Sequence, residues 1–173
     1  MKDEYYVRMI ESVKKSKVKL RMIPVFDKLI TYVIFMSYPL MLSYLFFTHS
    51  PFLLQSLIVP ALGFVLVSLF RKSYDAKRPY EVMGFTPIIN KETSGKSFPS
   101  RHVFSIFIIG MTYFQLDSNT GIMIFIMGLI LAALRVFGGV HYIRDVVAGA
   151  ITGIVFGAIG FYIIHWETIF GGL

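Results

Sequence analysis

The chain has 173 residues, of which 55% are hydrophobic, and its mean hydropathy of +0.67 makes it too apolar for the surface of a soluble protein. It has no cysteine, which excludes disulfides, thiol catalysis and cysteine-bound metals. The net charge is +7, and because the basic residues border apolar runs, they favour lipid headgroups or anionic substrates over nucleic acid. The composition therefore predicts a polytopic membrane protein of the all-α class, a bundle of transmembrane helices.

The N-terminal segment, residues 1–22, interleaves lysines and arginines with Tyr6, Met9, Ile10 and Val13 at helical spacing. This pattern predicts a basic amphipathic helix on the membrane surface. A signal peptide is not expected, because no short apolar core with a small-residue cleavage site follows. The alternative is a solvated basic tail that orients the protein in the membrane.

Five apolar runs follow, and they predict a single domain over residues 1–173 with the transmembrane bundle in residues 23–173. The runs approach the ~20 residues that cross the hydrocarbon core, although the third is short. The predicted spans cover residues 29–47, 52–70, 102–116, 121–137 and 146–164. In the last span Gly149, Gly153 and Gly157 recur every four residues, which predicts a flat strip for close helix packing.

Three polar stretches border these spans, and all three are expected on one side of the membrane because the spans between them come in pairs. The first is RKSYDAKRP, residues 71–79. Arg71 and Arg78 are seven positions apart, so a continuing helix would aim both the same way until Pro79 ends it. Two guanidinium groups can clamp the oxygens of a phosphoryl group. The alternative for each arginine alone is an anchor at the membrane interface.

The second stretch is FPSRH, residues 98–102, immediately before the third span. Its proline and Ser100 suit the start of a helix, where exposed backbone amides favour an anion. His102 would lie beside that anion, in a position to give its proton to a leaving group.

The third stretch is RVFGGVHYIRD, residues 135–145. A helix from His141 onward would place Asp145 on the same face, where its carboxylate holds one ring nitrogen and leaves the other free. A histidine held in this way is prepared as a nucleophile or a base. The two glycines let the chain turn sharply, so Arg135 can point back toward the imidazole. A cation beside such a histidine indicates an anionic substrate.

Together the three stretches resemble the motifs of the type 2 phosphatidic acid phosphatase (PAP2) superfamily, whose active site is shared with the vanadium haloperoxidases. The family motifs are K-x6-R-P, P-S-G-H and S-R-x5-H-x3-D. They correspond here to Arg71-x6-Arg78-Pro79, Pro99-Ser100-Arg101-His102 and Arg135-x5-His141-x3-Asp145. Order and internal spacings agree over residues 71–145, and the five-span layout is similar to that of the small bacterial members.

Three positions depart from the family pattern. Arg71 replaces the usual lysine and keeps its charge. Arg101 replaces a glycine, so a bulky cation stands where the family needs only backbone, and it either adds a phosphate contact or narrows the pocket. Leu134 replaces a serine and removes one possible hydroxyl contact.

The resemblance implies a metal-independent phosphatase that needs no cofactor. His141 would attack phosphorus to form a phosphohistidine, Asp145 would orient it, and His102 would protonate the leaving group. The residues expected to bind the phosphoryl oxygens are Arg71, Arg78, Ser100, Arg101 and Arg135. The alternative, a metal site, would draw on nearby carboxylates whose spacing repeats no ligand pattern, namely Asp75, Glu81 and Glu92.

A site at the ends of membrane helices reaches phosphates at headgroup level, which favours a lipid phosphate or an isoprenyl diphosphate over a soluble ester. Phosphatidic acid, phosphatidylglycerophosphate and undecaprenyl diphosphate all remain open, as does the oligomeric state. Two alternatives belong to other classes of protein. One is a non-catalytic lipid-binding or scaffold protein, and the other is a small anion transporter, which would be expected to carry charges within its spans.

The distribution of charge predicts on which side of the membrane the site lies. All 17 lysines and arginines fall before the first span or in residues 71–101 and 135–144, which five spans place on one face. The positive-inside rule therefore predicts a cell-membrane protein with a cytoplasmic active site, although many bacterial relatives present this site to the outside.

Overall fold

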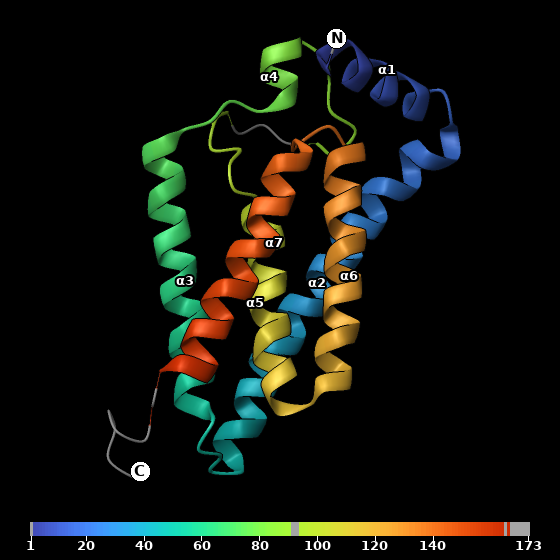
Figure 1. Cartoon of the computed structure of the whole chain (residues 1–173). Helices are drawn as coiled ribbons and strands as arrows, with labels where there is room; N and C mark the ends of the chain where they lie inside the picture. Colours follow the sequence, from blue (N-terminus) through green and yellow to red (C-terminus); the bar gives the residue numbers. More distant parts are fainter. Residues whose placement is uncertain (1, 91–93, 165, 167–173) are drawn as a thin grey trace.

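The computed structural model describes residues 2–90, 94–164 and 166, and all regular structure in this part of the chain is helical, as predicted. Figure 1 labels the α-helices. In chain order the elements are α1 (Lys2–Lys14), α2 (Lys17–Phe47), α3 (Leu53–Tyr74), α4 (Pro79–Met83), α5 (Arg101–Leu116), α6 (Ser118–Phe137), α7 (Ile143–Ala158) and a final π-helical turn, η1 (Ile159–Ile163).

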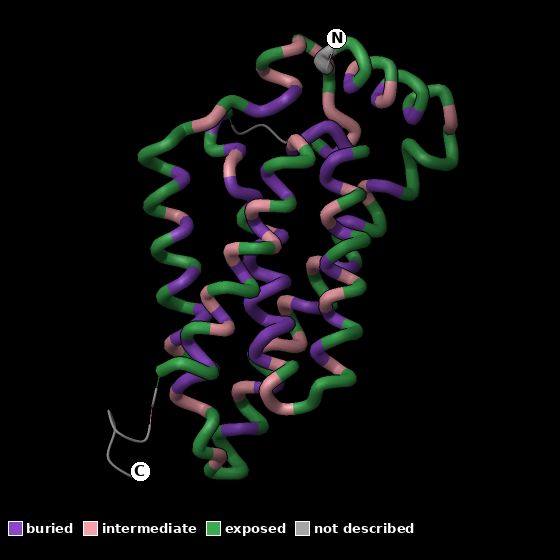
Figure 2. Tube along the Cα trace, in the orientation of Figure 1, coloured by how far each residue is buried: buried purple, intermediate pink, exposed green. Residues whose placement is uncertain are grey.

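Helix α5 is the centre of the bundle, and it contacts α2, α3, α6 and α7 (Figure 1). Ten consecutive residues of α5, from Val103 to Thr112, are buried. The run is almost entirely apolar, and the hydroxyl of Thr112 donates to the carbonyl of Ile108 within the helix (3.0 Å). Figure 2 shows this buried core surrounded by helices that are exposed on their outer faces. An apolar helix with no polar face suits a position enclosed by other helices.

Four helical stretches are long and apolar enough to cross a membrane, and at most a third of each apolar window is buried. Their outward-facing side chains are those expected to meet lipid. These stretches are Lys17–Phe47, Leu53–Met83, Ser118–Phe137 and Ile143–Ile163. At 16 residues, α5 is shorter, as the sequence predicted for the third span. The expected number of about five spans is therefore approximate, with four outer helices and a short central one.

The predicted extent of the N-terminal helix is wrong, because α1 ends at Lys14 and a second helix starts three residues later. Ser16 adopts an extended backbone and its side chain accepts a hydrogen bond from the amide of Lys19, which caps α2. The basic residues 17–22 are thus the first turns of α2, which runs unbroken to Phe47.

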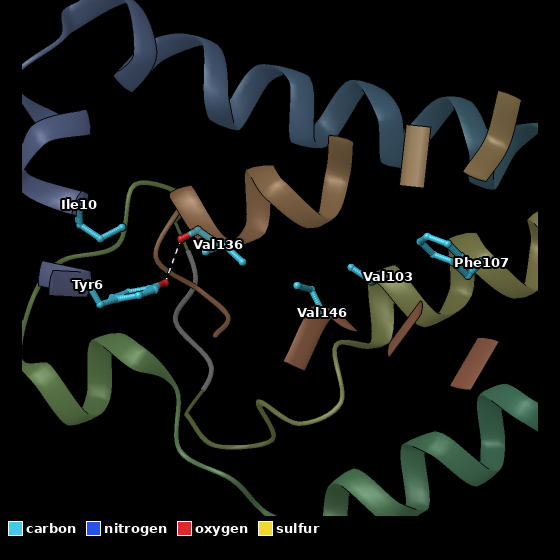
Figure 3. Close-up of a cluster of buried hydrophobic side chains, with 6 residues drawn as sticks. All are labelled: Tyr6, Ile10, Val103, Phe107, Val136 and Val146. Carbon is cyan, nitrogen blue, oxygen red and sulfur yellow. Dashed lines mark hydrogen bonds between the residues drawn. The ribbon is translucent and has the colours of Figure 1, made fainter. Parts of the chain in front are cut away.

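Helix α1 lies across the end of the bundle that carries the long loops (Figure 1). Its buried face consists of Tyr6, Ile10 and Val13. Tyr6 and Ile10 belong to one cluster with Val136 at the end of α6, as Figure 3 shows. The helix is amphipathic as predicted, but its apolar face packs on protein.

The glycine strip of α7 faces α5, as predicted. A Cβ on Gly149, Gly153 or Gly157 would come within 2.5–2.8 Å of α5 or the residue before it. Since two of these clashes are with backbone carbonyls, a side chain could be accommodated only by separating the helices. The close approach brings the start of α7 beside the start of α5, where the amide of Ser100 donates to the carbonyl of Asp145 (2.8 Å).

Candidate active site

The three motif stretches meet at the end of the bundle covered by α1 and enclose a cavity of about 550 Å³. Residues from α3, the connection between α3 and α4, the α4–α5 loop, the start of α5 and the loop before α7 form its wall. They are Ser68, Arg71, Lys72, Arg78, Ser94, Gly95, Lys96, Arg101, His102 and His141. Five of these ten residues are lysine or arginine, so the cavity suits a polyanion.

His141 and Asp145 are both fully buried, and 3.4 Å separates the histidine Nδ1 from the aspartate Oδ2. His141 lies just before α7 rather than within it, but the first turn still brings Asp145 to its ring. Because Asp145 holds Nδ1, the second ring nitrogen, Nε2, remains for the cavity side. The paired geometry expected from the i,i+4 spacing is therefore present.

Ser97 completes this pair, and sequence reasoning missed it. Its buried hydroxyl donates to Asp145 Oδ2 at 2.5 Å and lies 3.4 Å from His141 Nδ1. The amide of Tyr142 donates to the same carboxylate oxygen (3.0 Å). With donors on it from two directions, the carboxylate is fixed against the imidazole. The one hint in the sequence was its position, three residues before Ser100 of the second motif.

Arg78 is 2% exposed and reaches the opposite ring nitrogen, with its Nη1 3.5 Å from His141 Nε2. The same Nη1 donates to the carbonyl of Val140 (3.1 Å), and Nε donates to the carbonyl of Gly95 (3.0 Å). These bonds fix the guanidinium at the wall where an anion would approach the histidine.

The continuous helix that would have aimed Arg71 and Arg78 alike is not formed. Helix α3 ends at Tyr74, Asp75 turns the chain with φ at 40°, and Arg78 precedes α4 in an extended conformation. The turn still delivers both arginines to the cavity. Arg71 donates to the carbonyls of Ser97 and Pro99, so it also holds the loop that carries the second motif.

The carboxylates considered for a metal site hold the loop backbone. Glu81 accepts hydrogen bonds from the amides of Arg78 (2.7 Å) and Gly95 (3.0 Å). Asp75 accepts one from the amide of Lys96 (3.2 Å). Both therefore shape the cavity wall, and Glu92 lies outside the described residues.

The second motif begins α5. Ser100 precedes α5 as expected, but its buried hydroxyl has no hydrogen-bond partner within the described part of the chain and does not cap the helix. Arg101 lies over the ring of Phe64, with its guanidinium carbon 5.2 Å from the ring centroid. His102 stacks on Phe35, with 6.3 Å between ring centroids. Both of these pairs stand at the edge of the cavity.

An apolar groove of about 390 Å³ adjoins the cavity across these two stacked pairs. It lies between α2, α3 and α5, and both Phe35 and Phe64 belong to its wall. A molecule with a charged head and an apolar chain could therefore occupy both spaces at once.

Arg135 pairs with Asp27, an acid just before the first predicted span. Its Nε lies 2.6 Å from Oδ1 of Asp27, on α2, and both side chains are 5% exposed. Arg135 and Ser100 are not among the residues that line the cavity. At the other end of the third motif, the exposed Arg144 places its Nε 3.6 Å from Asp145 Oδ1.

Tyr6 ties α1 to the loop that carries His141. Its hydroxyl lies 2.9 Å from the carbonyl oxygen of Val136 and 3.0 Å from that of His141 (Figure 3 shows the first contact). Burial raises the pKa of this phenol above its usual range, and the neighbouring Tyr142 and Asp145 raise it further. The hydroxyl therefore stays protonated, and the two carbonyls share its one proton.

Comparison with known proteins identifies the family of this chain. The model of the PAP2 superfamily matches residues 52–169, which include all three motifs. The "Bacitracin transport permease protein BcrC" of Bacillus licheniformis is 29% identical over 103 residues, which are 57% of this chain and about half (51%) of that protein. The crystal structure of Aquifex aeolicus LpxE is similar in fold, with a TM-score of 0.65 and 23% identity over 82% of this chain and 91% of that one. The protein thus belongs to the PAP2 superfamily.

Proposed function

We propose that this protein is a membrane-integrated phosphatase that hydrolyses a phosphomonoester or diphosphate of a lipid through a phosphohistidine on His141. One observation carries the proposal. A fully buried histidine, held at Nδ1 by Asp145, presents Nε2 beside Arg78 at the wall of a cavity rich in cations. This is the arrangement that prepares a histidine to attack an anionic phosphorus centre.

In the first step Nε2 of His141 forms a bond to the terminal phosphorus while the bond from that phosphorus to the leaving oxygen breaks. The leaving oxygen is the ester oxygen of a lipid monophosphate or the bridging oxygen of a lipid diphosphate. The electron pair goes to that oxygen, which takes a proton from His102. Asp145 stabilises the positive charge that develops on the imidazole, and Ser97 keeps the carboxylate in place. In the second step water attacks phosphorus, the N–P bond breaks, and His102 accepts the proton of the water.

Arginine supplies the charge neutralisation that a metal supplies in other phosphatases. Arg71 and Arg78 are buried and fixed by backbone carbonyls, so they need no reorganisation when charge develops on the phosphoryl oxygens. We expect turnover to survive EDTA. Complete loss of activity on chelation, with recovery on adding magnesium, would contradict this mechanism.

The apolar groove beside the cavity favours a lipid substrate. It can hold the first part of the lipid's apolar chain while the phosphate occupies the cavity next to His141. Within the lipid class we favour a diphosphate headgroup. Three further cations of the wall, Lys72, Lys96 and Arg101, are exposed, whereas Arg71 and Arg78 are buried, so a second phosphate would have partners of its own.

Phosphate release from a panel of lipids tests this function. Purified protein would be assayed against phosphatidic acid, phosphatidylglycerophosphate and undecaprenyl diphosphate, with His141→Ala as the blank. We expect release from at least one of them and the highest kcat/KM with the diphosphate. No release from any member of the panel would contradict the proposal.

The two alternatives make different predictions. An anion transporter would carry phosphate into liposomes without hydrolysing a lipid, and the word permease in the name of BcrC is a reason to test this class. A scaffold protein would bind lipid with neither flux nor hydrolysis. Stoichiometric phosphate release that vanadate inhibits favours the enzyme, whereas ion flux without hydrolysis favours the transporter.

We further propose that the active site faces the cytoplasm, as the positive-inside rule predicts. The loops at the opposite end of the bundle, residues 48–51 and 117–120, contain no lysine or arginine. Single cysteines at Ser94 and Asn119 would be tested in intact cells with a membrane-impermeant maleimide. Labelling at position 119 alone is expected, and labelling at position 94 alone would place the site outside.

A further inference from the structure

Asp27 is a buried acid that none of the three motifs includes. Within the described residues only two carboxylates are buried, Asp27 (3% exposed) and the catalytic-motif residue Asp145. Asp27 lies on α2, the helix next to the site end of α6, and its Oδ1 is 2.6 Å from Nε of Arg135. An acid in this position is costly to bury, and its pairing with the arginine offsets that cost.

Arg135 connects this pair to the active site. Its carbonyl accepts the amide of Val140 (3.2 Å), so its backbone is part of the turn that presents His141. The carbonyl of Val140 in turn accepts a hydrogen bond from Nη1 of Arg78 (3.1 Å), so one residue joins Arg135 to the arginine beside His141. A guanidinium held through Nε keeps four N–H groups on its terminal nitrogens, which is enough to bind phosphate oxygens while the acid holds it.

Asp27 also lowers the positive potential that an anion meets in the cavity. Arg71 and Arg78 line the cavity, Arg135 adjoins its wall through Val140, and all three side chains are buried, so their weakly screened charges would bind phosphate product tightly. A fixed carboxylate beside one of them lowers that attraction by one unit of charge. A phosphatase must release inorganic phosphate in each cycle, so an overly strong anion site would slow turnover.

We infer that Asp27 is a positioning residue that fixes Arg135 and weakens the affinity of the site for phosphate enough for product release. This inference rests on the proposed phosphatase function. Helix α2, which carries none of the family motifs, would then contribute to phosphate release through Asp27.

The test measures binding of inorganic phosphate to purified protein in detergent by titration calorimetry, with kcat and KM for the lipid substrate measured in parallel. Asp27→Asn keeps the shape and an acceptor oxygen but removes the charge. We expect its affinity for phosphate to increase on the order of tenfold and its kcat and KM to fall together. Glu11→Gln removes an exposed acid on the same side of the membrane. It is expected to change neither the affinity for phosphate nor the kinetic constants.

The double variant Asp27→Asn/Arg135→Gln removes both charges and leaves no buried ion unpaired, so it decides the question even if Asp27→Asn does not fold. Its net charge is that of the unmodified protein, but it lacks the N–H donors of Arg135, and we expect weaker phosphate binding. Affinity equal to that of the unmodified protein in the double variant, or unchanged or weaker affinity in a folded Asp27→Asn, would overturn the inference. Because binding is read without turnover, failure of the phosphatase assay alone leaves this result interpretable.

Discussion

Replacing Ser97 by alanine isolates the contribution of the bond that fixes Asp145. The serine is fully buried, and its hydroxyl donates to Oδ2 of Asp145 at 2.5 Å. A hydrogen bond to a charged group contributes about 1.5–3 kcal/mol. If this contribution is made mainly in the transition state, where the imidazole of His141 gains positive charge, kcat should fall roughly tenfold to 150-fold.

The assay is steady-state phosphate release from the preferred lipid in detergent micelles. KM should change little, because Ser97 touches the catalytic pair and is not among the residues that line the cavity. Ser73→Ala, an exposed serine at the end of α3 on the same side of the membrane, is the matched control and should stay within about twofold. A folded Ser97→Ala with unchanged kcat would refute the view that this serine positions Asp145.

Three further predictions follow from contacts elsewhere in the site and bundle. Tyr6→Phe removes the donor to the carbonyls of Val136 and His141, so the protein should lose on the order of 1 kcal/mol of stability and kcat should fall several-fold as the loop that carries His141 loosens; an unchanged kcat would argue against α1 acting on the loop. Gly153→Val would place a Cβ 2.8 Å from the carbonyl of Phe104, so the detergent-solubilised protein should lose about 1–3 kcal/mol and unfold at a lower temperature; an unchanged midpoint would mean that α5 and α7 separate without cost. Arg135→Ala should lose far more kcat/KM than Arg144→Ala, because the Arg144 side chain is 70% exposed and its charge is screened; equal losses would contradict this ranking.

The sequence predicted the elements whose signal is local. Apolar runs of sufficient length gave the bundle helices, and the buried α5 was foreseen as the short third span. The glycine repeat of α7 predicted its packing face because a spacing of four residues maps directly onto one side of a helix. The i,i+4 relation likewise predicted the approach of Asp145 to His141, although His141 precedes the helix rather than starting it.

The contacts that the sequence could not predict join residues that are far apart in the chain. Tyr6 and Val136 are 130 positions apart, and Ser97 and Asp145 are 48 apart, so no periodicity relates them. Asp27 stands beside Lys28 at the start of an apolar run, where an acid is expected at the membrane surface. Only the packing of α2 against α6 shows that it is buried against Arg135.

The break at Asp75 was missed for a different reason. The spacing of Arg71 and Arg78 fits two helical turns. The α4–α5 loop, however, forms hydrogen bonds with the residues that would have continued α3. Asp75 accepts the amide of Lys96 and adopts a left-handed conformation that ends α3. Local helical spacing was therefore overridden by a tertiary contact.

Trapping of the covalent intermediate tests most directly whether His141 is the nucleophile. Purified protein would be mixed with lipid carrying a radioactive phosphoryl group and quenched within one turnover. A phosphohistidine is stable in alkali and labile in acid, so we expect alkali-stable label on the peptide that contains His141 and no label on a folded His141→Ala variant. Lipid hydrolysis by the unmodified protein without any label at His141, or equal labelling of the alanine variant, would contradict the proposed mechanism.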